Sequence, residues 1–451
     1  MPAERRFVAP AAWVRGAWAH DVLLVAGADG RWAQVVPDAA PADCAGAERL
    51  AGPVLPGLVD AHSHAFQRAI AGLTERSAAG SDNFWRWRDR MYAAALRITP
   101  QQLEAIAAYL YAELLRAGYT HVCEFHYLHN DTGGQPYADA AEMSRALVRA
   151  AQRVGIGITL LPTLYMRSGF GAKGLRDDQR RFASTPEGVL RIAQDVAAGD
   201  LVASGVALHS LRAVDEVAMG EIASGAASGA PLHIHVAEQQ QEVADCLEHH
   251  GRRPVEWLLA NARLDARWNL VHATQATPGE LAALRATGAA IVLCPSTEAN
   301  LGDGVFDLPA WMGASGRWSI GSDSHVTRSW TEELRLLEYS QRFMLRQRNV
   351  AAQAAVAGST AAALFDGALE GGSAAAGVPL GGLAVGQRAD FAVIDTASPS
   401  LVGVPPGLTL DALVFSSPDA RLGRVVVAGR DVALEHDAAA FDAAMRALWA
   451  D

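Results

Sequence analysis

Eight short apolar segments recur between residues 54 and 325, and longer amphipathic or alanine-rich stretches separate them. The segments cover residues 54–62, 119–127, 156–165, 203–210, 231–238, 268–273, 288–296 and 318–325. Their length is typical of buried strands, and strands that alternate with helices indicate parallel βα units. Eight such units in roughly 270 residues match the usual size of a (β/α)8 barrel. We therefore predict a TIM-like barrel of the α/β class, with a doubly wound open sheet as the structural alternative.

The stretches between these segments carry helix start and stop signals. Residues 99–118, "TPQQLEAIAAYLYAELLRAG", have Pro100 in the first turn and Gly118 at the end. Residues 277–288, "TPGELAALRATG", open with Thr-Pro and close on glycine in the same way. Proline is favoured in the first turn of a helix and glycine just beyond its end. Both stretches are therefore predicted to be helices.

The two ends of the chain have a different pattern. Residues 1–53 and 376–432 consist of short alternating segments broken by glycine and aspartate, which is typical of β-hairpins. The last fifteen residues, "DAAAFDAAMRALWAD", indicate a terminal helix. We predict that residues 1–53 and 376–451 form a small β-sandwich domain that carries this helix. Residues 54–375 are predicted to form the barrel.

Charge and composition restrict the possible partners. The chain has 38 Lys and Arg against 49 Asp and Glu, and this net charge of −11 argues against nucleic acid or an anionic membrane as the main partner. Its four cysteines form no CxxC pair, which favours reduced thiols over disulfides or a thiolate zinc site. There is no apolar run of about 18 residues and no signal-peptide core. We expect a cytoplasmic protein that acts on a small molecule.

Histidines gather at the ends of the predicted strands, where active sites of barrels lie. His62 and His64 are two residues apart, so a strand directs both side chains to the same face. The fifth segment offers His233 and His235 on one face, and His235 is the better ligand because it is nearer the strand end. His62, His64 and His235, with Asp323 from the eighth segment, form a ligand set suited to Zn²⁺, although iron or manganese also accepts such ligands. His233 is predicted to belong to the core.

Four motifs, "PGLVDAHSH", "HIHVAEQ", "VHAT" and "IGSDSH", occur in this order and resemble the amidohydrolase superfamily. Many members bridge two metal ions with a carbamylated lysine, but Lys173, the single lysine of this chain, lies in a loop beyond the third segment. The resemblance therefore implies a site with one metal ion. Members of that kind are often deaminases, which use a Glu after the fifth-strand His and a His on the sixth strand. Glu238 and His272 match these positions.

More particular motifs resemble the formimidoylglutamate deiminase family. They are "HAFQRAIAGLTE", "FWRWRDRMY", "CEFHYLHND", "LHSLRAV", "HIHVAEQ" and "CPSTEANLGDG". The resemblance implies hydrolysis of N-formimino-L-glutamate to N-formyl-L-glutamate and ammonia, with one Zn²⁺ per chain, in histidine degradation. It also suggests a homodimer.

The resemblance and the chemistry together assign roles to three residues. Zinc lowers the pKa of bound water from 15.7 towards about 7. We expect Asp323, as ligand and base, to take the proton of that water. His272 would orient the attacking oxygen and stabilise the tetrahedral intermediate. Glu238 would hold the amidine nitrogen and protonate it so that ammonia can leave; the alternative for Glu238 is a helix cap or a surface carboxylate.

A substrate with two carboxylates requires cations in its pocket, and arginine binds a carboxylate through two parallel N–H donors. From the resemblance, Arg212 and Arg88 are the expected clamps, supported by Gln67, Tyr127 and His209. Arg86 competes with Arg88, because the repeated Trp-Arg of "WRWR" leaves the register open.

Several neighbouring residues have a structural interpretation. The aromatic residues Phe84, Trp85, Trp87 and Tyr92 are expected to pack beneath a loop. Cys294 is expected to be a small buried residue, because no base is evident beside it.

Two other functions remain open at this stage. A deaminase or chlorohydrolase that acts on a heterocycle such as guanine would share the metal ligands and differ in the substrate pocket. A barrel without catalysis that serves as a binding protein would have no reason to keep all four ligands together with Glu238 and His272.

Overall fold

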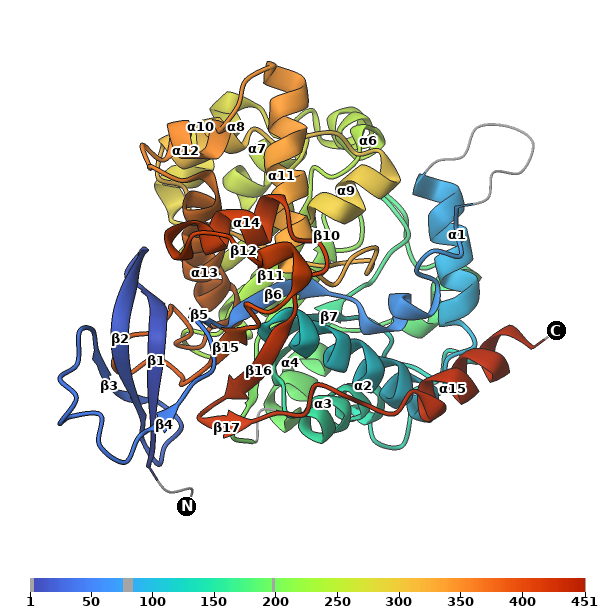
Figure 1. Ribbon diagram of the computed structural model, residues 1–451. Helices are drawn as coiled ribbons and strands as arrows, with labels where there is room; N and C mark the ends of the chain where they lie inside the picture. Colours follow the sequence, from blue (N-terminus) through green and yellow to red (C-terminus); the bar gives the residue numbers. More distant parts are fainter. Residues whose placement is uncertain (1–3, 76–83, 197–198, 451) are drawn as a thin grey trace.

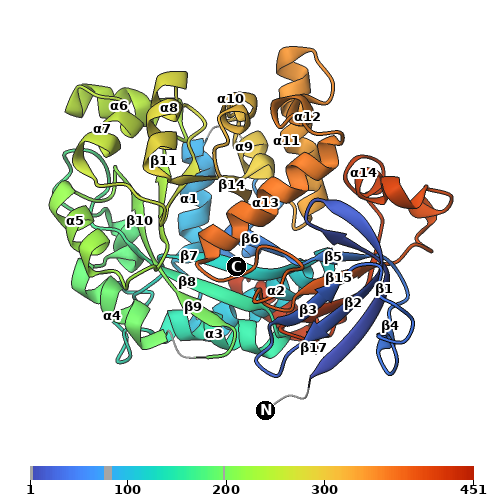
Figure 2. The same ribbon diagram turned by 90° about the vertical axis from the view of Figure 1, so that its left-hand side faces the viewer.

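The structure is a computed structural model that describes residues 4–75, 84–196 and 199–450; the side chains of residues 84–86 are also outside the description. Figure 1 shows a barrel surrounded by helices, with a smaller sheet at its side where the first and last strands of the chain meet. Turned by 90°, this sheet lies beside the barrel helix α13 (Figure 2). In the described part of the chain, no helix is long and apolar enough to cross a membrane.

The barrel contains, in the described residues, eight strands that pair in parallel in the order β14-β13-β12-β11-β10-β8-β7-β6. They are β6 (Leu58–Ser63), β7 (Tyr119–His126), β8 (Gly157–Leu164), β10 (Val206–Ser210), β11 (Leu232–Val236), β12 (Trp268–His272), β13 (Ala290–Leu293) and β14 (Trp318–Ile320). A short strand, β9 (Val202–Ser204), pairs with β8 outside this path. The predicted (β/α)8 architecture is confirmed.

The barrel closes between its last and first strands. The backbone N–H of Asp323, just after β14, donates to the carbonyl of His62 in β6 at 2.9 Å. The N–H of His64 donates back to the carbonyl of Asp323 at 3.3 Å. This closure brings two segments more than 250 residues apart in the sequence to the same point at one end of the barrel.

Helices cover the outside of the barrel and follow its strands. They are α1 (Phe84–Ala95), α2 (Pro100–Ala117), α3 (Glu142–Val154), α4 (Pro186–Val196), α5 (Glu216–Gly225), α6 (Gln240–His250), α7 (Pro254–Asn261), α8 (Pro278–Thr287), α9 (Pro295–Leu301), α10 (Leu308–Gly313), α11 (Trp330–Leu345), α12 (Val350–Ala354) and α13 (Thr360–Ala376). The predicted helices at 99–118 and 277–288 correspond to α2 and α8. In each, a threonine caps the first turn and a glycine with positive φ ends the last turn.

The termini pair into one curved sheet. Its strands, in the order β17-β16-β15-β5-β1-β2-β3 with β4 beside β1, are β1 (Arg5–Val14), β2 (Ala17–Ala26), β3 (Trp32–Val36), β4 (Glu48–Arg49), β5 (Val54–Pro56), β15 (Phe391–Ile394), β16 (Leu422–Val427) and β17 (Arg430–Asp431). The sheet curls so that Trp32 of β3 contacts Phe391 of β15, with ring centroids 5.9 Å apart. A buried apolar cluster that includes Phe7, Trp32 and Phe391 fills the interior of this curl.

The other described elements lie in loops or in the C-terminal segment. The 3₁₀ turns η1 (Ala65–Ala69) and η2 (Asp177–Phe182) follow the barrel strands β6 and β8. The turns η3 (Pro399–Leu401) and η4 (Pro406–Leu408) and the helix α14 (Thr409–Phe415) lie between β15 and β16, and α15 (Ala439–Trp449) follows β17. The predicted terminal helix corresponds to α15, which packs against α2 at the barrel surface (Figure 1).

The first apolar segment divides between the two sheets. Residues 54–56 form β5 in the terminal sheet, and residues 58–63 form β6 in the barrel. Gly57 lies at the break, and a Cβ atom at this position would be only 2.3 Å from Oγ1 of Thr120. Glycine therefore permits the close approach that carries the chain from one sheet to the other.

Candidate metal centre and active site

Three imidazoles converge where β6 and β11 end. Nε2 of His62 lies 3.1 Å from Nε2 of His64 and 3.0 Å from Nε2 of His235. Oδ1 of Asp323 lies 3.4 Å from Nε2 of His64 and 3.7 Å from Nε2 of His62. All four side chains are buried. The four residues expected to bind a metal ion are thus brought together.

Hydrogen bonds and burial prepare these histidines for a cation. The Nδ1–H groups of His64 and His235 each donate to a backbone carbonyl, of Phe125 and of His209, both at 2.8 Å. Their Nε2 lone pairs therefore face the other imidazoles. Burial lowers the pKa of His64 to about 3 and holds the pKa values of His62 and His235 well below the usual range, so the rings are neutral. Three neutral imidazole nitrogens that face one another at this spacing, two of them with their lone pairs directed inward, fit a metal ion.

The loop that carries Asp323 is held by a buried carboxylate. Asp60 in β6 accepts hydrogen bonds from the backbone N–H of Ser322 at 2.8 Å and from its hydroxyl at 2.5 Å. Burial raises the pKa of Asp60 and that of Asp323 to about 7 in each case. Asp323 and His272 both have positive φ, 46° and 69°, a conformation that non-glycine residues rarely adopt and that often marks functional sites.

His272 lies between three carboxylates. Its Nε2 is 3.8 Å from Oε1 of Glu238 and 3.8 Å from Oδ2 of Asp323, while its Nδ1 is 3.2 Å from Oε1 of Glu298. Burial by itself would lower the pKa of His272, but the negative charges of these carboxylates outweigh it and raise the pKa to about 10. The arrangement allows His272 to hold or deliver a proton beside the metal ligands.

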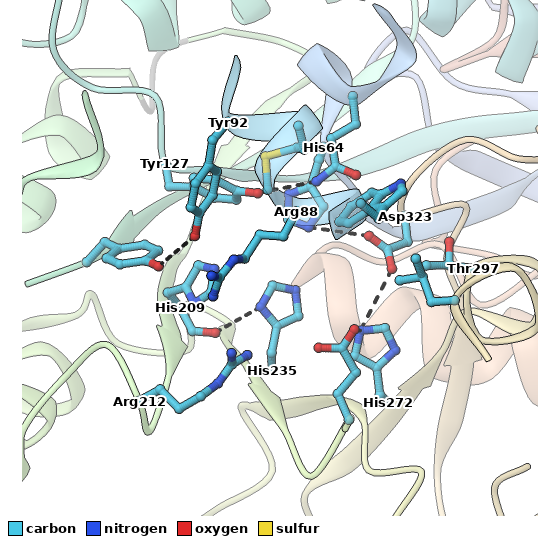
Figure 3. A pocket seen from close by; sticks show the side chains of 16 residues that line it. His64, Arg88, Tyr92, Tyr127, His209, Arg212, His235, His272, Thr297 and Asp323 are labelled. Carbon is cyan, nitrogen blue, oxygen red and sulfur yellow. Dashed lines mark hydrogen bonds and ion pairs between the residues drawn. The ribbon is translucent and has the colours of Figure 1, made fainter. Parts of the chain in front are cut away.

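A pocket opens onto this cluster, and Figure 3 shows side chains from several strands and from α1 directed into it. It is lined by His64, Gln67, Trp87, Arg88, Met91, Tyr92, Tyr127, Tyr165, His209, Arg212, His235, Glu238, His272, Thr297, Leu301 and Asp323. The list includes all five residues expected to bind the substrate. It also includes the three residues with expected catalytic roles, Glu238, His272 and Asp323.

The two arginines reach the pocket from different elements. Arg88 lies on α1, with its guanidinium carbon 5.4 Å from the ring centroid of Tyr92. Arg212 follows β10; burial would lower its pKa, but the charges of Glu242 and Glu238 raise it, so the side chain stays protonated. The side chain of Arg86, the competitor of Arg88, lies outside the described residues.

A glutamine and a tyrosine complete the wall near the metal ligands. Nε2 of Gln67, in η1, donates to the hydroxyl of Tyr127 at 3.2 Å. Burial raises the pKa of Tyr127 well above its usual range, so its hydroxyl stays protonated. His209 packs beside this ring and beside His235, and burial keeps its imidazole neutral by lowering its pKa.

Comparison with known proteins identifies the family. The model of the amidohydrolase family matches residues 54–432, which is most of the chain. The chain belongs to the amidohydrolase family. This amidohydrolase is 47% identical over 420 residues to the formimidoylglutamate deiminase of Pseudomonas aeruginosa, a match that covers 92% of this chain and 91% of the relative.

Solved structures resemble this amidohydrolase over nearly its full length. A crystal structure of an amidohydrolase from Brucella melitensis has a TM-score of 0.92 at 41% identity and covers 99% of this chain and 100% of its own. A crystal structure of an adenosine deaminase from Xanthomonas campestris with bound zinc has a TM-score of 0.78 at 21% identity, covering 99% of this chain and 98% of its own. The second likeness is one of fold alone.

Other polar groups at the strand ends of this amidohydrolase have structural partners. The carboxylate of Glu124 accepts from Ser63, Ala65 and Tyr111 beneath the metal ligands. His233 is fully buried, and its Nε2–H donates to the carbonyl of Ala375 at 2.9 Å, in accordance with the expected core position. These groups therefore position the site instead of lining it.

Glu298 is a site residue that the sequence analysis did not single out. It lies inside the motif "CPSTEANLGDG", in the first turn of α9 directly after β13. Its Oε1 also accepts the backbone N–H of Cys294 at 2.9 Å, and this bond fixes the carboxylate beside His272. Its place within one helical turn of a strand end was the sequence signal that could have marked Glu298 as a candidate site residue. Cys294 itself is buried, as expected.

Tyr92 has a position different from the expected one. It was predicted to pack beneath a loop with Phe84, Trp85 and Trp87. Tyr92 and Trp87 instead line the pocket, while the side chains of the other two lie outside the described residues. The helix α1 begins after the segment 76–83 and turns this face toward the barrel mouth, which no local pattern reveals.

Proposed function

We propose that this amidohydrolase is a zinc-dependent formimidoylglutamate deiminase, which hydrolyses N-formimino-L-glutamate to N-formyl-L-glutamate and ammonia in histidine degradation. The observation that carries the proposal is the presence of Arg88 and Arg212 in the same pocket as the histidine cluster. Two guanidinium groups match a substrate with two carboxylates, whereas a neutral heterocycle has no use for them. The similarity to the Pseudomonas aeruginosa enzyme supports the same substrate.

His62, His64, His235 and Asp323 would hold the metal ion. A zinc ion held by this set would make a nucleophile available, because it would lower the pKa of bound water towards about 7. The identity of the ion as zinc is part of the proposal, since imidazole and carboxylate ligands also suit iron and manganese.

The protein side chains distribute the protons of the reaction. Asp323 takes the proton of the attacking water, and its Oδ2 lies 3.8 Å from Nε2 of His272. His272 donates a hydrogen bond to the oxygen that attacks the amidine carbon and stabilises the tetrahedral intermediate. Glu238 binds the terminal amidine nitrogen and protonates it, so that the C–N bond breaks and ammonia leaves. Water thus adds to the amidine carbon, and a formyl group remains on the substrate nitrogen.

The substrate-binding residues orient the amidine towards these groups. Arg88 and Arg212 bind the two carboxylates, while Gln67, Tyr127 and His209 support them by hydrogen bonding. Because each arginine is fixed on a different element, both carboxylates must be present for the full binding energy. A substrate that lacks one carboxylate should therefore bind more weakly.

The assembly and location of the enzyme are also proposed from its family resemblance. We infer that it works as a homodimer in the cytoplasm. Light scattering on the purified protein would give a mass of about twice 47.6 kDa if it is a dimer, and a monomer mass would contradict the inference.

The first test is release of ammonia from N-formimino-L-glutamate by purified protein whose metal content has been measured. N-formimino-glycine and guanine serve as parallel substrates. Turnover of the glutamate compound alone, with about one zinc per chain, is the expected result. Turnover of guanine would overturn the arginine clamp and favour the heterocycle alternative. Absence of turnover on all three, with zinc bound, would contradict the proposed substrate.

A further inference from the structure

A buried glutamine joins two tyrosine hydroxyls at the wall of the pocket. Nε2 of Gln179, in η2, lies 3.2 Å from the hydroxyl of Tyr92 and 2.9 Å from that of Tyr165. The two hydroxyls lie 3.2 Å apart. Gln179 is fully buried, and both tyrosines line the pocket. Figure 3 shows Tyr92 with a dashed line from its hydroxyl to that of its partner.

The orientation of the Gln179 amide follows from a backbone contact. Its Oε1 accepts the N–H of Arg176 at 3.1 Å, and only the carbonyl oxygen of an amide can accept. The NH₂ group must therefore face the tyrosines. Gln179 donates one hydrogen to each phenolic oxygen.

Counting hydrogens then leaves one donor over. Tyr92 and Tyr165 each carry one hydroxyl hydrogen, and one of these two makes the bond between the hydroxyls. Gln179 has its donors on this side and cannot accept the other hydrogen. Within the described part of the chain, neither hydroxyl has a further acceptor. A buried donor needs a partner, and the pocket that both rings line is where one can enter.

The hydroxyl pair lies at the end of the pocket away from the metal ligands. The ring of His209 is 5.2 Å from that of His235 and 4.2 Å from that of Tyr165, so it separates the pair from the metal cluster. The guanidinium carbon of Arg88, which lines the same pocket, is 5.4 Å from the ring centroid of Tyr92. That of Arg176 is 5.7 Å away, but Arg176 is paired with Asp178 through two hydrogen bonds. A donor beside the pocket arginine Arg88 favours a negatively charged acceptor.

We propose that the hydroxyl pair Tyr92–Tyr165 donates a hydrogen bond to the substrate carboxylate farther from the amidine, and that Gln179 is the positioning residue that directs this donor. The inference rests on the proposed function and extends it, because it names a determinant of the choice between a dicarboxylate and its half-amide. An amide at the same position would present NH₂ groups to a site built from donors, and would bind less well.

Two variants test the inference. Gln179→Glu keeps an oxygen for the N–H of Arg176, but its second oxygen accepts the hydroxyl hydrogens and turns them away from the pocket. Tyr92→Phe/Tyr165→Phe removes both hydroxyls and adds no charge, so it keeps the test valid if the buried glutamate disturbs folding. Tyr109→Phe is the matched control, since that ring stacks on Phe441 of α15 with centroids 4.4 Å apart.

The measurement is the affinity of the zinc-loaded enzyme for N-formyl-L-glutamate and N-formyl-L-glutamine, determined by calorimetry. We expect the wild-type protein and the control to prefer the carboxylate, and both pocket variants to lose about tenfold or more of that preference, as for a hydrogen bond to a charged group. In turnover, KM for N-formimino-L-glutamate should rise while kcat changes little, because the bond is present in the ground state and in the transition state.

The outcomes separate this inference from the proposed function. A wild-type protein without a preference for the carboxylate, variants that keep the wild-type preference, or variants that lose both ligands equally would each overturn the role of the hydroxyl pair. Failure of the wild-type protein to hydrolyse N-formimino-L-glutamate would overturn the proposed function. Even without that hydrolysis, loss of the preference for N-formyl-L-glutamate over N-formyl-L-glutamine in both variants would support the role of the hydroxyl pair.

Discussion

The environment of single residues decides which of the many histidines and carboxylates form the site. His272 and His233 are both buried, yet one is surrounded by three carboxylates and the other donates to a backbone carbonyl. The negative charges around His272 outweigh burial and raise its pKa to about 10. Around His233 burial dominates and lowers the pKa to about 4.

Glu298 offers a test of how His272 is held. Replacing Glu298 with Leu removes the acceptor for the His272 Nδ1–H, and kcat should fall by about a hundredfold, the lower end of the range for a proton-transfer group. Glu298→Gln keeps a carbonyl oxygen as acceptor and should stay much closer to wild type. Steady-state kinetics with metal analysis would check this. Equal losses in both variants would show that the charge, and not the hydrogen bond, is required.

At the scale of the element, the position of a side chain along its strand selects the metal ligand. His233 and His235 lie on the same face of β11, but only His235 reaches the end of the barrel where β6 also ends. His233 lies one layer deeper and bonds to the chain at the end of α13.

This placement predicts that two substitutions on β11 affect the metal content differently. His235→Ala should reduce the zinc content after dialysis below one ion per chain, because it removes one of the four protein ligands and weakens zinc binding. His233→Gln should keep the metal, since the glutamine amide can still donate to the carbonyl of Ala375. Elemental analysis after dialysis distinguishes the two. Metal loss in both variants, with folding intact, would contradict the core assignment of His233.

The cap of α2 predicts a change in stability without a change in chemistry. The hydroxyl of Thr99 accepts the backbone N–H of Gln102, and the side chain of Gln102 bonds back to the N–H of Thr99. Thr99→Ala should lower the free energy of unfolding by about 1 kcal/mol. Thr99→Ser keeps the acceptor and is the control. Urea denaturation measures the difference, and an equal loss in both would rule out the cap as its cause.

At the scale of the whole molecule, the terminal sheet joins the two ends of the chain across the outside of the barrel. An ion-pair cluster fastens this connection: Arg424 of β16 bonds to Glu48 of β4 and to Asp431 of β17, and Arg5 of β1 bonds to the same two carboxylates. The cluster thus adds ion pairs between residues from both termini to the strand pairing of β5 with β15 and to the shared apolar cluster.

This cluster makes the terminal sheet sensitive to acid. The hydrogen bond from Arg424 lowers the pKa of Glu48. Burial would raise the pKa of Asp431, but the hydrogen bonds and charges of Arg424 and Arg5 together lower it. A carboxylate whose pKa is lowered on folding contributes stability above its unfolded pKa and loses it as the pH falls through the folded value. The sheet should therefore be weakened below about pH 4.

Hydrogen exchange of β16 and β17 at pH 7 and at acidic pH measures this effect. Asp431→Asn should reduce the difference between the two conditions, while Asp419→Asn, at an exposed position outside the cluster, should leave it unchanged. If the Asp431 variant keeps the full acid sensitivity, other carboxylates are responsible. High salt should also weaken the wild-type sheet, because the cluster is partly exposed.

Much of this architecture could be predicted from local patterns. The eight apolar segments all form strands, and the capping residues of α2 and α8 lie where their sequences indicate. His62 and His64 could be proposed as ligands because the period of a strand puts them on one face, and His235 because it is nearer the end of its strand than His233. Such predictions succeed because each depends on residues that are neighbours in the chain.

The chain by itself thus determined the strand and helix segments and the faces on which histidines lie. The tertiary structure decided which segments meet. Closure between β6 and β14 brings Asp323 to the histidines, and β12 and α9 bring His272 to Glu298. Gln179 joins the hydroxyls of Tyr92 and Tyr165 from two other segments. These contacts cross long separations in sequence, so their geometry follows from packing of the complete barrel, and no local period encodes it.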